Sequence, residues 1–154
     1  MKTKSIIAVA VFCFASAILS LAQDAQLGSW KLNESKSTFS PGAPKTTSGM
    51  YAAAGDSVKV TLDGTSFDGK PTHNEWTGKY DGKDYPVTGD PNQSSRSYTM
   101  VNPHSMTFIV KSGDKPILTG TIDISADGKT RTVKANGMSA AGMKISYSAV
   151  YDKQ

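Results

Sequence analysis

The sequence predicts an all-β protein, an antiparallel up-and-down meander that closes into a barrel of 8–10 strands. Three observations support this fold. Apolar residues alternate with polar ones in several segments, as at Val58, Val60 and Leu62, which would bury one face of each strand. Asp-Gly pairs, which tolerate the positive φ of tight turns, separate these segments. Helix formers are rare after residue 22, where only four leucines and two glutamates remain.

The strands follow one another with short connections. We expect them at 28–33, 46–53, 57–66, 70–80, 84–87, 94–101, 105–111, 116–125, 129–136 and 143–152. The clearest alternation lies in 105–111 and in 143–152, where every second residue is apolar. Turn signals punctuate the chain at Asp63-Gly64, Asp68-Gly69, Asp81-Gly82, Asn102-Pro103, Ser112-Gly113-Asp114 and Asp127-Gly128.

The lengths of the connections predict a cup that is open at one end. Successive connections of a meander alternate between the two ends of the barrel. The three longest, at 34–45, 88–93 and 137–142, are the first, fifth and ninth, so they fall at the same end. Tight turns remain for the opposite end. Longer loops on a rigid scaffold are where binding residues tend to lie.

The first 22 residues are typical of a secretory signal peptide, which leaves a single domain at 23–154. Lys2 and Lys4 precede an apolar run, and small residues stand before a cleavage point after Ala22. The run is shorter than the ~20 residues that a spanning helix needs, which disfavours an uncleaved anchor. We therefore expect an exported protein, periplasmic or secreted. Its mature chain has no thiol, because Cys13 lies within the signal.

The start of the first strand carries a resemblance to a known group of barrels. Gly28-Ser29-Trp30-Lys31-Leu32 resembles the Gly-x-Trp opening of lipocalins and fatty-acid-binding proteins, and the final residues 150–153 resemble their last strand. The resemblance implies a calycin-like barrel, here of an exported bacterial lipocalin-like type, in which Trp30 plugs the closed end. It also implies a basic side chain stacked on that Trp. Arg131 is the better candidate and Lys153 the alternative.

Departures from this group affect the ligand more than the fold. The connection at 34–45 is too rich in Ser, Pro and Gly for a two-helix lid. The lipocalin Thr-Asp-Tyr motif is absent, with Asp84-Tyr85 as a partial match. The Arg-x-Tyr that holds a fatty-acid carboxylate is missing from the last strand. The resemblance therefore supports the barrel and argues against a fatty acid.

An Arg-x-Tyr pattern does occur elsewhere, on the sixth expected strand. If Tyr98 and Met100 point inward, Arg96 does so too, and together Arg96 and Tyr98 would anchor a carboxylate near the mouth. In the other orientation Ser97, Thr99 and Val101 point inward and Arg96 is a surface charge. The candidate cavity residues are Trp76, Tyr80, Arg96, Tyr98, Phe108, Leu118, Ile122 and Tyr147. Trp76 and Tyr80 would either line the cavity or fill the core.

Catalytic, metal and nucleic-acid signatures do not emerge from the sequence. The two histidines, His73 and His104, are not at metal-ligand spacing, and no Gly-x-Ser-x-Gly nucleophile motif is present. The Asp-Gly-Lys repeats lack the spacing of a calcium loop. Basic residues are interleaved with Asp rather than clustered. We expect no enzyme, no cofactor, no metal and no nucleic-acid partner, and the sequence identifies no protein partner.

Two functions of different kind follow. The first is an exported lipocalin-like protein that binds a small apolar or amphipathic molecule inside the barrel. The alternative is a solid barrel that acts as a protein-interaction module of the cell envelope and takes no ligand. A third reading, an outer-membrane barrel, conflicts with Lys59, Lys79 and Lys144 on the faces opposite the apolar ones.

Overall fold

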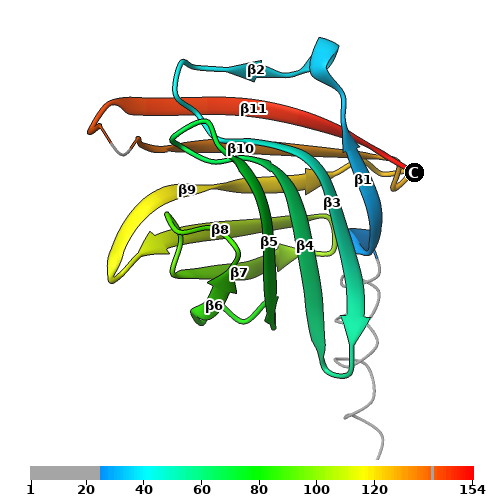
Figure 1. The fold of residues 1–154 in the computed structure, drawn as a ribbon. Coiled ribbons are helices and arrows are strands. Elements are labelled where there is room, and N and C mark those ends of the chain that lie inside the picture. Colours follow the sequence, from blue (N-terminus) through cyan, green and yellow to red (C-terminus); the bar gives the residue numbers. More distant parts are fainter. Residues whose placement is uncertain (1–24, 140) are drawn as a thin grey trace, which may run out of the picture.

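The computed structural model describes residues 25–139 and 141–154, so the expected signal peptide at 1–22 lies outside the described residues. The described chain is almost entirely β-structure (Figure 1). Its elements are β1 (Gly28–Leu32), a 3-10 turn η1 (Glu34–Lys36), β2 (Thr38–Phe39), β3 (Lys45–Ala54), β4 (Ser57–Thr65), β5 (Pro71–Gly78), β6 (Tyr85–Thr88), β7 (Ser95–Asn102), β8 (Ser105–Ser112), β9 (Lys115–Ile124), β10 (Thr130–Met138) and β11 (Lys144–Lys153). Each strand expected from the sequence is present, with bounds shifted by at most two residues.

Antiparallel pairing closes these strands into a barrel, which confirms the predicted fold class. Each strand from β3 to β10 pairs with the next one along the chain. β1 completes the ring because it pairs with β3 on one side and β11 on the other. In that register Trp30 lies opposite Gly49 and Lys153. The closed circuit of ten strands leaves β2 as an additional short segment.

β2 is the element that the sequence did not predict. It continues the path of β1 along the same edge of β11, since Leu32 pairs with Tyr151 and Thr38 with Ser148 (Figure 1). Residues 33–37 bulge out between the two segments. The Ser37 hydroxyl bridges the gap, because it donates to the Asn33 carbonyl at 2.7 Å and accepts from the Val150 N–H at 2.9 Å. A strand of two residues is too short to show the alternation of apolar and polar residues that predicted the other strands.

One expected turn is wrong. Asp63-Gly64 does not reverse the chain but lies within β4, opposite the shift of register between Thr46 and Ser48 in β3. A Cβ at position 64 would lie 2.0 Å from the Lys45 carbonyl oxygen, so glycine allows this close approach of the two backbones. The pair therefore marks a β-bulge rather than a hairpin.

The two ends of the barrel differ less than expected. The connections 33–44, 89–94 and 139–143 lie at one end, and the short turns at 55–56 and 103–104 lie at the other. The connections 79–84 and 125–129 also lie at that second end and are as long as 89–94 and 139–143, so only 33–44 is distinctly longer. Gly89 has a φ of +86° in the 89–94 connection, and a Cβ there would lie 2.0 Å from the His73 carbonyl oxygen. We call this end the mouth, and the opposite end, where β1 begins, the closed end.

The interior is built by the alternation seen in the sequence. In β8, Met106, Phe108 and Val110 are buried while the residues between them are not. The buried hydrophobic residues form one cluster, comprising Trp30, Tyr51, Val58, Val60, Trp76, Val87, Tyr98, Met106, Phe108, Val110, Leu118, Ile122, Ile124, Ala135, Ile145, Ala149 and Tyr151. This cluster surrounds the barrel axis without filling it.

Candidate functional site

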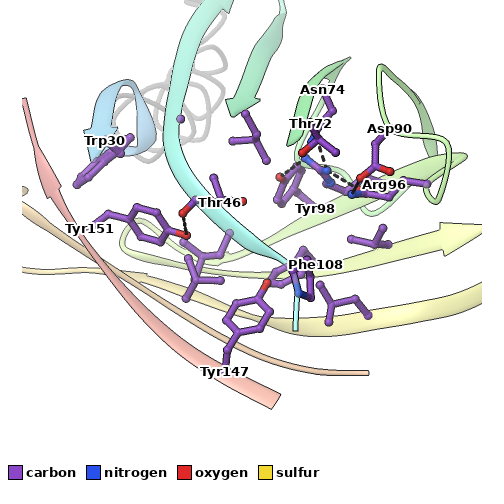
Figure 2. A pocket seen from close by; sticks show the side chains of 18 of the residues that line it. Trp30, Thr46, Thr72, Asn74, Asp90, Arg96, Tyr98, Phe108, Tyr147 and Tyr151 are labelled. Carbon is purple, nitrogen blue, oxygen red and sulfur yellow. Dashed lines mark hydrogen bonds between the residues drawn. The ribbon is translucent and has the colours of Figure 1, made fainter. Parts of the chain in front are cut away.

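A cavity runs along the barrel interior from the mouth toward the closed end (Figure 2). Pro44, Phe67 and Gln93 line it at the mouth, and Trp30 and Arg131 line it at the other end. Between the two ends, one side of the wall is apolar and includes Phe108, Val110, Leu118, Ile122 and Val133 from β8, β9 and β10. Polar side chains of β3, β4, β5 and β7 also line the cavity, among them Thr46, Thr65, Thr72, Asn74 and Arg96. The barrel is therefore hollow, which fits a container for one small guest.

The size of the cavity limits the guest. The centre of a water molecule can move through about 80 Å³, and the space reaches about 780 Å³ when the part open to solvent is counted. A sphere of 80 Å³ enlarged by the ~1.4 Å radius of water has a volume of roughly 280 Å³, and an elongated space gains more, so this value is a minimum. Typical ligand pockets span roughly 300–1,000 Å³, so the cavity has room for one small molecule.

Arg96 is the central polar group of the cavity. It is only 4% exposed, and it points inward from β7 together with Tyr98. Its Nη1 donates to the Tyr98 hydroxyl at 3.3 Å, and its Nη2 donates to Asn74 Oδ1 at 3.2 Å and to Gln93 Oε1 at 2.7 Å. Figure 2 shows Arg96, Tyr98 and Asn74 gathered on one side of the cavity. The orientation with Arg96 on the surface is therefore wrong, and Val101 is exposed instead.

No carboxylate pairs directly with this guanidinium. Among the described residues, no Asp or Glu oxygen lies within 4.0 Å of Arg96. Asp90 is buried nearby, but its two oxygens accept from the Asn92 N–H at 2.9 Å and from Gln93 Nε2 at 2.7 Å. Gln93 thus stands between Asp90 and Arg96. The pKa of Arg96 lies above its usual value, since burial lowers it less than Tyr98 and the other tyrosines raise it.

A second buried guanidinium lies at the closed end. Arg131 is 2% exposed, and it donates to Gln26 Oε1 at 3.0 Å and to the Tyr51 hydroxyl at 2.7 Å. Its Cζ lies 4.0 Å from the Tyr51 ring centroid and 5.8 Å from that of Trp30. Lys153 also approaches Trp30, with Nζ 5.2 Å from the ring centroid, but its side chain is exposed. Both basic candidates thus lie against Trp30, and Arg131 is the one inside the barrel.

Tyrosine hydroxyls add further polar groups to the cavity. Tyr51 and Tyr151 line the cavity near the closed end, and Tyr147 lies on the wall opposite Arg96 (Figure 2). Burial raises the pKa of Tyr51 and Tyr151 above the ordinary value of 10.0. Both hydroxyls therefore stay protonated at neutral pH. The nearby guanidinium charges of Arg131 and Arg96 offset part of this increase at Tyr51.

The structure places the eight candidate cavity residues in two groups. Arg96, Tyr98, Phe108, Leu118, Ile122 and Tyr147 line the cavity. Trp76 and Tyr80 do not, although their inward alternation suggested it. The Trp76 indole packs behind Tyr98 with ring centroids 4.9 Å apart, and its N–H donates to the Arg96 carbonyl at 2.8 Å. Tyr80 stacks on Trp76 at 6.3 Å, so both aromatics fill core space beside the cavity.

Other lining residues were not selected from the sequence. Tyr151 shares the inward face of its strand with Tyr147, and Asn74 precedes Trp76 by two residues, so alternation could have identified both. Asp90 and Gln93 lie in a connection without periodicity. Nothing in the local sequence indicates that these two side chains turn toward the barrel axis.

Comparisons with known proteins identify similar solved structures but no family. No protein-family model matches the chain, and no curated protein matches it. EF1p2_mFAP2b bound to DFHBI is 15% identical with a TM-score of 0.47, and the match covers 88% of this chain and 99% of that one. A redesigned β-barrel, mFAP1, bound to DFHBI, is 13% identical with a TM-score of 0.41, covering 86% and 98%. At these values neither likeness carries an argument about function.

Two further findings concern the described part of the chain. It contains no helix that is both long and apolar enough to cross a membrane. Within residues 25–139 and 141–154, no three His, Cys, Asp or Glu side chains are grouped so that they could hold a metal ion.

Proposed function

We propose that this protein is an exported, lipocalin-like carrier that binds one small apolar or amphipathic molecule inside its barrel. The observation that carries the proposal is the cavity itself, which has an apolar side on β8, β9 and β10 and polar side chains that include Arg96. An apolar guest would displace water from Phe108, Leu118 and Ile122, and Arg96 and Tyr98 would orient its polar end.

The cavity contradicts the filled interior on which the alternative function depended. A solid barrel would leave no room for a guest, whereas the space enclosed here exceeds the 10–15 Å³ that a single water centre needs by roughly fivefold. We therefore favour ligand binding over a role confined to protein contacts.

The proposed location rests on the sequence. Residues 1–22 have the charge and apolar run of a cleaved signal, so we place the mature protein in the periplasm or outside the cell. A carrier needs no catalytic group, and we propose a non-enzymatic role. Fractionation of cells and the mass of the purified chain would test both the location and the cleavage after Ala22.

Binding can be tested with a neutral fluorescent arene, N-phenyl-1-naphthylamine, whose emission rises when it leaves water. Val133 lines the cavity from β10, so Val133→Trp would fill the space with an indole. Ile109 points outward from β8 and is exposed, so Ile109→Trp adds similar bulk to the surface. We expect saturable binding to the wild type and to Ile109→Trp, and at least a roughly tenfold weaker affinity in Val133→Trp.

The two variants also define the results against the proposal. Equal affinity in both variants would place the probe outside the barrel. Absence of saturable binding to the wild type would remove the support for a carrier of apolar molecules. Circular dichroism confirms that each variant retains its β-structure before binding is compared.

A further inference from the structure

We infer that the ligand of this cavity is a small organic anion, a carboxylate on a one- or two-ring aromatic body, whose anionic group binds Arg96. This inference rests on the proposed function and specifies its ligand class. It is carried by the charges that face the cavity, by the partners of Arg96, and by the size of the enclosed space.

The charges facing the cavity do not balance. Arg96 and Arg131 supply two buried positive charges, and Asp90 supplies one negative charge at the mouth. A buried charge without an opposite partner is costly, because it loses hydration without gaining an ion pair. Asp90 does not satisfy this need, because the Gln93 amide lies between its carboxylate and Arg96. An anion entering from the mouth would supply the missing charge.

The partners of Arg96 are all neutral and can be exchanged. Its hydrogen bonds to Tyr98, Asn74 and Gln93 use three of the five N–H donors of a guanidinium. A carboxylate matches the planar fork with two parallel hydrogen bonds, which are stronger than those to a neutral amide. The Gln93 carbonyl oxygen, at 2.7 Å, is the partner that a ligand oxygen would replace, since Gln93 lies in the connection at the mouth.

The second guanidinium strengthens the preference without contacting the ligand's anionic group. Arg131 is held at the closed end by Gln26 and Tyr51, and it lines the same cavity as Arg96. A charge removed from water is screened less than it would be in solution. Arg131 therefore adds to the positive potential that an anion at Arg96 experiences.

The volume and the walls indicate the body of the ligand. A space of at least roughly 280 Å³ accommodates a compact aromatic molecule of one or two rings. Phe108 and Tyr147 present aromatic surface to the cavity, against which a flat ring can pack.

The test compares two ligands of nearly identical shape, 2-naphthoate and 2-naphthamide, by isothermal titration calorimetry at neutral pH. The wild type should bind the anion roughly 10- to 100-fold more tightly than the amide, as expected for charge-assisted hydrogen bonds in a buried site. Arg96→Met keeps an unbranched apolar stem and removes the charge. It should abolish this preference, because the anion loses an ion pair at Arg96 whereas the amide loses only a hydrogen bond.

A matched control and a second variant make the result specific. Lys134→Met removes a positive charge from the outer face of β10 and should leave the preference unchanged. Arg96→Lys keeps the charge without the planar fork and should retain part of the preference.

Failure of the inference and failure of the proposed function give different results. Equal binding of naphthoate and naphthamide by the wild type would overturn the anion preference and leave the carrier function standing. A preference that survives Arg96→Met but disappears in Arg131→Met would overturn the assignment to Arg96. If neither naphthalene ligand nor N-phenyl-1-naphthylamine binds, the carrier function itself fails.

Discussion

The closed end of the barrel offers a direct test of how its buried charge is stabilised. Arg131 is 2% exposed, and its Nη2 donates to the Tyr51 hydroxyl at 2.7 Å. Tyr51→Phe removes this acceptor and keeps the aromatic ring that lies 4.0 Å from the guanidinium carbon. The substitution therefore separates the hydrogen bond from the cation–π contact.

The expected magnitude follows from the burial of the pair. A hydrogen bond to a charged group contributes about 1.5–3 kcal/mol, and the N–H left behind has no water to bind. We expect Tyr51→Phe to lower the free energy of unfolding by about 2 kcal/mol. With an unfolding entropy of about 2.1 cal/mol/K per residue and roughly 130 residues, this corresponds to a Tm lower by about 7 °C.

A double-mutant cycle assigns the effect to this one contact. In an Arg131→Met background the hydroxyl has no charged donor, so Tyr51→Phe should cost less than about 1 kcal/mol. Urea unfolding followed by the fluorescence of the buried Trp30 and Trp76 gives each free energy. Tyr85→Phe is the control, because that hydroxyl donates to Asp81 on the surface. An equal loss in both Arg131 backgrounds would refute the reasoning.

Two further predictions concern pH and the mouth. Burial raises the pKa of Tyr51 and Tyr151 in the folded state above 10.0. The free energy of unfolding should therefore be constant up to about pH 10 and fall as the pH rises further. Urea midpoints measured between pH 8 and 11.5 would show this decrease, and a flat profile would contradict it. Gly89 has a φ of +86°, and a Cβ there would lie 2.0 Å from a carbonyl oxygen, so Gly89→Ala should lower the free energy of unfolding by about 2–3 kcal/mol. Gly55→Ala should cost less, because a Cβ at that position meets nothing within 4 Å. Equal losses of stability in thermal unfolding would contradict this.

The strands could be predicted because their cause is local. In β8 and β11 every second side chain faces the core, and this alternation is visible in the sequence whatever the strand pairs with. The same periodicity placed Tyr147 on the inner face, and Arg96 and Tyr98 on a shared face. It could not choose which face of β7 pointed inward, because Ser97 and Thr99 form an equally regular set on the opposite side.

Other features depend on relations between distant parts of the chain. β2 forms because residues 38–39 meet the free edge of β11, more than a hundred positions away. Gln93 reaches Arg96 because the 89–94 connection turns toward the mouth. Trp76 misses the cavity because Tyr98 stands in front of it. None of these outcomes follows from the residues on one element alone.

Whether the barrel is hollow depends on the total volume of the side chains that point inward. The chemistry of these side chains is as informative as their volume. Apolar side chains could have filled the positions of Arg96 and Arg131 at no cost in desolvation. Instead each guanidinium is held by neutral amides and phenols, which solvate the charge without neutralising it. Such partners keep a positive charge in place inside the barrel, and those of Arg96 can be exchanged for a ligand without moving a proton. This arrangement contributes little to stability, and it supports the anion recognition that we propose.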